Sequence, residues 1–234
     1  MKLTLIGIGN VGTNLSAAFQ KAGHEVQQLS GRNFVPQEVR GDVVVVCVKD
    51  DVIRNVVETM ADSRRLIVHT AGSKPMDILS TPRRGVLYPM QTFSKSRLID
   101  FDDIPLFIEA ENEEDLKLLE QLATSISRHV YPLDSQRRKF LHLAAVFACN
   151  FTNHCYNIAA EILKKSDIPF NVMLPLIDET ARKVHNLTPR EAQTGPAVRF
   201  DEGVIRNHEN MLTDDVRDLY RLMSKSIHKY HDKL

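Results

Sequence analysis

Short apolar or β-branched runs, separated by polar or glycine-containing segments, dominate the first 130 residues of the chain. The runs occupy residues 3–6, 42–48, 66–70, 85–88, 105–108 and 129–131. A continuous apolar run is typical of a strand buried on both faces, as in a parallel sheet that helices cover. Helical patterns fall between several of the runs. We therefore predict an α/β fold with a mostly parallel sheet in the N-terminal part.

A different pattern begins near Asp134 and continues to the C-terminus. Residues 136–165 contain neither glycine nor proline, and further helical segments follow, one of them starting at Thr188 with a capping box to Glu191. A 30-residue helix extends about 45 Å, whereas a hundred-residue domain has a radius of gyration of about 13 Å. We therefore expect residues 135–234 to form an all-α substrate and dimerisation domain, through which the protein forms a homodimer. The alternative is that the long helix spans both domains of one monomer.

The first apolar run leads directly into Gly7-Ile-Gly9-Asn10-Val11-Gly12. In a Gly-x-Gly-x-x-Gly turn, the first glycine permits the tight turn, the second lets the backbone approach a pyrophosphate, and the third lets the helix pack on the strand. The amides at the start of that helix would hold the anion. A second strand is expected at residues 25–29, which is the spacing of a βαβ unit. Residues 1–134 are therefore predicted to be a Rossmann-type dinucleotide-binding domain, with Asn10 and Val11 at the cofactor.

The end of the second strand indicates which dinucleotide binds. Sites that select NAD usually place an acidic residue there, whereas this sequence has Ser30 and Arg32. A hydroxyl and a guanidinium can hydrogen-bond a 2′-phosphate, so NADP is favoured over NAD. Arg40 is an alternative to Arg32 for this role. Val48, at the end of the third strand, is a further candidate for cofactor contact.

Charge and cysteine content narrow the classes of partner. Thirty basic residues balance thirty acidic ones, so nucleic acid and anionic membranes are not expected partners. Cys47, Cys149 and Cys155 lie in apolar surroundings, and we interpret all three as core thiols of a cytoplasmic protein. No segment reaches membrane-spanning length, and no Cys/His spacing resembles a metal site.

Four polar residues are candidates for the chemistry. Asn150 and His154 lie four positions apart on the predicted long helix, so they would share one face. His69 and Tyr88 end two of the predicted strands, at the edge where open parallel sheets bind ligands. His154 could act as an acid or base and Asn150 could orient a substrate. The alternatives are a satisfied polar patch for Asn150 and His154 and a core histidine for His69.

Several motifs together resemble a family of Rossmann-like proteins with an uncharacterised helical C-terminal domain. That family is related to deazaflavin-dependent NADP reductases, pyrroline-5-carboxylate reductase and the β-hydroxyacid dehydrogenases. In the last group the long helix carries a catalytic lysine and, four residues later, an asparagine, whereas this chain has Asn150 and His154. The motifs are Gly7-Ile-Gly-Asn-Val-Gly12, His69-Thr-Ala-Gly72, Tyr88-Pro-Met-Gln-Thr-Phe93, Ala148-Cys-Asn-Phe-Thr-Asn-His154, Pro175-Leu-Ile-Asp-Glu-Thr180 and Gln193-Thr-Gly-Pro-Ala197.

The resemblance implies a fold and a cofactor, and the family's reaction is not established. Our leading hypothesis is an NADP-dependent oxidoreductase that transfers a hydride to or from a small carbonyl, hydroxyl or imine substrate. The alternative is a sensor or scaffold protein that binds NADP without catalysis, since a fold does not dictate a function.

Overall fold

The structure is a computed structural model that describes residues 1–60 and 64–231. The chain divides into two compact units, Met1–Phe151 and Thr152–Leu234. The first helix after the last strand, α4 (Ser135–Ala145), begins just beyond Asp134 and belongs to the first unit. The assignment of residues 135–234 to a substrate and dimerisation domain therefore stays a prediction.

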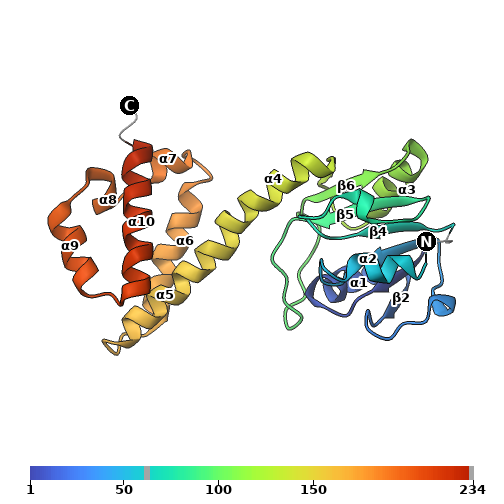
Figure 1. The fold of residues 1–234 in the computed structure, drawn as a ribbon, viewed down its shortest axis with the longest axis horizontal. Coiled ribbons are helices and arrows are strands. Elements are labelled where there is room, and N and C mark those ends of the chain that lie inside the picture. The colour runs from blue at the N-terminus through green and yellow to red at the C-terminus, as the bar shows by residue number, and fades with distance from the viewer. Residues whose placement is uncertain (61–63, 232–234) are drawn as a thin grey trace. The chain divides into compact units, whose positions relative to one another are not determined.

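A seven-stranded sheet forms the centre of the first unit (Figure 1). The strand order is β2-β1-β3-β4-β5-β6-β7, and neighbouring strands pair in parallel except β5 and β6. This topology confirms the predicted Rossmann-type sheet, in which the strand order reverses at β1. The strands are β1 (Lys2–Ile6), β2 (Glu25–Leu29), β3 (Val43–Val46), β4 (Leu66–His69), β5 (Arg84–Pro89), β6 (Leu106–Ala110) and β7 (Val130–Pro132).

Helices cover both faces of this sheet. Residues of α1 (Asn10–Lys21) and α3 (Glu113–Thr124) share one core cluster with Val43 and Val45 of β3. Residues of α2 (Ile53–Glu58) share a second cluster with Val44 and Val46. Successive strand residues point to opposite faces, so all four valines are buried. The unbroken apolar run that predicted a central strand is explained by this arrangement.

Residues 135–164 are helical without interruption, close to the predicted range of 136–165. The helix is not uniform, because α4 and α5 (Thr152–Lys164) are joined by a π-helical segment, η3 (Val146–Phe151). A π-helical turn holds more residues than an α-helical one. Side-chain positions before and after η3 are therefore offset from those of a regular helix.

The second unit is built from helices. The predicted capping box is confirmed: Oγ1 of Thr188 accepts from the amide of Glu191, and Oε2 of Glu191 accepts from the amide of Thr188. The further helices of the second unit are α6 (Leu174–Lys183), α7 (Pro189–Ala192), α8 (Pro196–Arg199), α9 (Glu202–Asn210) and α10 (Asp214–His231). Short 3-10 helices are η1 (Pro36–Glu38) and η2 (Met76–Ile78) in the first unit and η4 (Phe170–Met173) in the second.

The cysteines differ from the expectation of three core thiols. Cys47 is buried, but Cys155 is half-buried. Cys149 is exposed and lies in η3, a segment in which no residue is buried. Over residues 1–60 and 64–231, no helix is long and apolar enough to cross a membrane. Within the same ranges, no group of three or more His, Cys, Asp or Glu residues is placed to hold a metal ion.

Candidate functional site

The first glycine of the turn after β1 has a conformation that other residues rarely adopt. Gly7 has a φ of +130°, and a Cβ there would lie 2.3 Å from the carbonyl oxygen of Cys47. Its amide donates to the carbonyl of Leu29 at 2.8 Å, which joins the carboxyl ends of β1 and β2. Gly7 is therefore required by the fold itself.

The other two glycines have opposite environments. A Cβ at Gly12 would lie 2.2 Å from the carbonyl oxygen of Gly7, so this glycine lets α1 pack closely on the turn. A Cβ at Gly9 would meet only the carbonyl oxygen of Cys47, at 4.0 Å, and Gly9 is exposed. The backbone at Gly9 is therefore open to a ligand. Gly9 is the N-cap of α1, where exposed amides and the helix dipole favour an anion.

The residues predicted to flank a cofactor surround this turn. Asn10 is exposed at the first position of α1, whereas Val11 is half-buried and packs on the core. Val48 lies across from the end of β2, since a Cβ at Gly31 would lie 2.5 Å from its Cγ1 atom. Val48 and Gly31 therefore bring the segments after β3 and β2 together at the carboxyl edge of the sheet.

The loop after β2 carries the groups expected to recognise a 2′-phosphate. The amide of Arg32 donates to Oγ of Ser30 at 3.4 Å, so the serine side chain lies in the same turn as the arginine. Arg32 is exposed. The backbone amide of Arg40 donates to Oγ1 of Thr4 and Oε1 of Gln27, while the Arg40 residue as a whole is exposed. Both arginines therefore present accessible cations near β2.

His69 is fully buried at the end of β4. Its Nδ1 accepts from the amide of Ala71 at 3.1 Å, so Nε2 carries the proton and donates to the carbonyl of Pro75 at 3.2 Å. Burial, followed by the nearby positive charge of Arg138, lowers the pKa of His69 to about 4. A neutral imidazole with both nitrogens engaged fits the core-histidine alternative.

Tyr88 lies near the end of β5 and meets a residue that the sequence analysis did not single out. Its hydroxyl is 3.2 Å from Nδ1 of His142, on α4. A Cβ at Gly72 would lie 2.7 Å from both Nδ1 of His142 and Cζ of Tyr88. The absence of a side chain at Gly72 therefore permits the two rings to approach each other. Burial raises the pKa of Tyr88, which is largely buried.

A buried arginine fixes the start of α4 against the sheet. Arg138 forms an ion pair with Glu109 of β6, and its Nη2 donates to the carbonyl of Lys74 at 2.8 Å and to Oγ of Ser135 at 3.0 Å. Oγ of Ser135 in turn donates to Glu109 at 2.7 Å. His142 follows Arg138 by four positions, so this anchor also sets the position of the imidazole one turn later.

Asn150 and His154 lie on either side of the division between the two units. Asn150 lies in η3 and His154 in α5, with the division between the two units at Phe151. Both residues are exposed. Their catalytic role stays a prediction.

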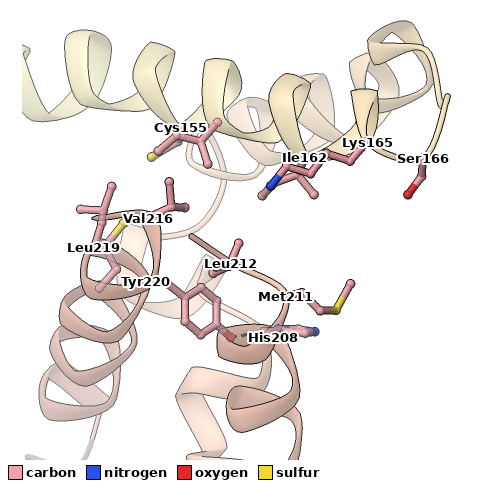
Figure 2. Close-up of a pocket in the computed structure, with 12 residues that line it drawn as sticks. Cys155, Ile162, Lys165, Ser166, His208, Met211, Leu212, Val216, Leu219 and Tyr220 are labelled. Carbon is pink, nitrogen blue, oxygen red and sulfur yellow. Dashed lines mark hydrogen bonds between the residues drawn. The ribbon is translucent and has the colours of Figure 1, made fainter. Parts of the chain in front are cut away.

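The second unit contains an apolar cavity of about 430 Å³, bordered by α5, α9 and α10. Figure 2 shows Cys155 and Ile162 of α5 facing Val216 and Leu219 of α10 across it. His154 lines a neighbouring hollow together with Ile158 and Leu212. Apolar side chains thus dominate this part of the helical unit.

Comparisons with known proteins identify relatives over the whole chain. A family model described as a domain of unknown function, DUF2520, matches residues 104–227. A crystal structure of a candidate NADP oxidoreductase from Bacteroides fragilis is 46% identical, with a TM-score of 0.90 over 97% of this chain and 98% of that one. No curated protein matches the sequence.

Two more distant solved structures share the fold. Pyrroline carboxylate reductase of Plasmodium falciparum with NADP bound is 12% identical, with a TM-score of 0.63 over 97% of this chain and 99% of that one. An imine reductase of Myxococcus stipitatus in complex with NADP⁺ is 14% identical, with a TM-score of 0.67 over 100% and 93%. The family match covers more than half of the 234 residues. The chain therefore belongs to the DUF2520 family, and the predicted family resemblance is confirmed.

Proposed function

We propose that this protein is an NADP-dependent oxidoreductase that acts on a small carbonyl, hydroxyl or imine substrate. The observation that carries the proposal is the open backbone at Gly9. The fold leaves room for a side chain at this position, so the glycine keeps the space free for a ligand. The Bacteroides fragilis protein, described as a candidate NADP oxidoreductase, supports the same activity.

The residues at the carboxyl edge of the sheet fit a dinucleotide. The amides after Gly9 would hold the pyrophosphate at the N-terminus of α1. Ser30 and Arg32 would bind the 2′-phosphate of the adenosine half near β2, with Val48 beside it. The remaining half of the cofactor would then extend over β3, β4 and β5, toward Tyr88. When bound, the reduced nicotinamide supplies a hydride.

The test is direct binding followed by turnover. Titration with NADPH and NADH, followed by nucleotide fluorescence, should show saturable binding that is tighter for NADPH. Oxidation of NADPH is then followed by absorbance with 2-methyl-1-pyrroline as an imine probe and with cyclohexanone as a ketone probe. Absence of NADPH binding contradicts the proposal as a whole. Binding without oxidation in either reaction supports the sensor or scaffold alternative instead.

We also propose that the protein forms a homodimer through helices of residues 135–234. Exposed apolar residues recur at intervals of three or four positions in α4 and η3: Phe140, Leu143, Phe147 and Phe151. The apolar cavity of the second unit offers a further surface of the same character (Figure 2). Large apolar patches of this kind typically mark an interaction site.

A further inference from the structure

Tyr88 lies at the same edge of the sheet as the glycine turn. The strand registers join Ile6 to Val46, Val46 to His69, and His69 to Val86. Tyr88 follows Val86 by two positions, so it extends beyond this row in the direction in which β1 leads into Gly7. Three strand spacings of about 4.8 Å separate β1 from β5, and the nicotinamide half of the proposed cofactor would lie over this interval.

We propose that Tyr88 and His142 form the proton-delivery pair of this site, with Tyr88 as the acid that protonates the substrate. The inference rests on the proposed function, because it assigns the proton that accompanies the hydride. It also specifies the substrate class for the reductive direction: a carbonyl or imine whose oxygen or nitrogen can reach the phenol.

The step balances with groups that this chain holds. As the hydride adds to the substrate carbon, the π electrons of the C=O or C=N bond move to the oxygen or nitrogen, which takes the proton from Oη of Tyr88. The resulting phenolate receives the proton from Nδ1 of His142, while Nε2 of the imidazole takes a proton from water. One solvent proton is consumed for each hydride transferred.

The surroundings of the phenol keep it protonated until the hydride is transferred. Burial keeps the pKa of Tyr88 above its ordinary value, so the phenol holds its proton at neutral pH. The Cys149 thiol also raises that pKa and Arg138 opposes the rise. A phenol has one hydrogen, so an imidazole that donates from Nδ1 leaves the hydroxyl proton free for the substrate. The half-buried imidazole keeps access to water.

Arg138 acts as a positioning residue for this pair. Its ion pair with Glu109 and its hydrogen bond to the carbonyl of Lys74 hold the first turn of α4 on the sheet. His142 then lies one turn further along, against Gly72. The pair therefore depends on contacts from β6 and from the loop after β4.

The first experiment decides the direction of the hydrogen bond without a substrate. Nitrogen-15 NMR of the histidine rings is recorded on the full chain with NADPH added, for the original protein and for Tyr88→Phe. We expect a proton on Nδ1 of His142 and a clear change of its resonance in Tyr88→Phe. The proposal is overturned if the proton is on Nε2 and Nδ1 is the acceptor. It is also overturned if the His142 resonance is the same in Tyr88→Phe as in the original protein.

The second experiment separates proton delivery from structural support. His142→Asn keeps an amide donor near the position of Nδ1 but cannot relay a proton. With the imine or ketone probe, Tyr88→Phe should lower kcat at least 100-fold and His142→Asn about 10-fold or more, with KM and NADPH affinity nearly unchanged. A Tyr88→Phe variant with more than half of the original kcat overturns the assignment. If the original protein does not bind NADPH, that result instead contradicts the proposed function.

Discussion

Arg138 and Glu109 form a buried ion pair that joins the first turn of α4 to β6. The arginine side chain is 1% exposed and the glutamate side chain 16%. Nη2 of Arg138 also donates to Lys74 and Ser135, whereas its Nε is buried and has no hydrogen-bond partner among residues 1–60 and 64–231. The pair therefore connects the helix that carries His142 to β6, which lies between β5 and the edge strand β7.

Removing one partner of this pair should be costly. Arg138→Met leaves the carboxylate of Glu109 in a largely buried place without its cation, and we expect a loss of about 3–5 kcal/mol in the free energy of unfolding. The double variant Arg138→Met/Glu109→Gln should recover part of that loss, because the uncompensated charge is gone. Urea unfolding followed by circular dichroism measures both. Equal stability of the single variant and the original protein would contradict the anchoring role.

Gly9→Val should abolish NADPH binding while the protein remains folded. The fold has room for a side chain there, because a Cβ meets only one atom, at 4.0 Å, so a loss of binding reports on the ligand. Fluorescence titration measures affinity and thermal unfolding measures integrity. Gly203→Ala in α9 is the matched control, since its Cβ would meet only Oδ1 of Asp201 at 3.6 Å. A Gly9→Val protein that binds NADPH normally would rule out the proposed pyrophosphate position.

Arg32→Ala should weaken NADPH binding about 10- to 100-fold and leave NADH binding nearly unchanged. The reason is the loss of a charge-assisted hydrogen bond to the 2′-phosphate, which NADH lacks. Parallel titrations with the two nucleotides give the ratio. Arg40→Ala tests the other exposed cation near β2. If only Arg40→Ala changes the ratio, the 2′-phosphate contact belongs to Arg40.

Acidification should destabilise the fold through His69. Its pKa in the folded protein is lowered from 6.5 to about 4, chiefly by burial. The unfolded chain therefore binds this proton first, and stability falls as the pH drops from about 6.5 toward about 4. Between about pH 7 and about pH 5 the expected contribution is about 2 kcal/mol. Urea unfolding of His69→Gln should show a smaller decrease over that range; an identical decrease would mean that His69 is not its source.

The protein should be a dimer at micromolar concentration, and charges on α4 should dissociate it. Phe140 and Leu143 are exposed apolar residues one turn apart, so Phe140→Asp/Leu143→Asp would place carboxylates in the proposed interface. Light scattering measures the mass. Lys139→Gln, an exposed position on the same helix, should leave it unchanged. A monomeric mass for the original protein would exclude the dimer.

Much of the fold and the glycine turn after β1 could be predicted from the sequence, because the signals are local. Gly7, Gly9 and Gly12 each act through the backbone at their own position, and the spacing of the turn, helix and second strand is set by chain geometry. The apolar run of β3 predicted burial on both faces for the same reason. The capping box of Thr188 and Glu191 spans only three positions, so the residue types alone were sufficient to predict it.

The tertiary structure decided which side chains meet. Tyr88 and His142 are 54 positions apart, and the charged stretch around Arg138 is typical of a solvated helix, so neither contact had a local signal. The buried state of His69 likewise depends on Ala71 and Pro75 closing around it. Sequence pattern determines local backbone and burial, while packing between distant segments selects the groups that share a site.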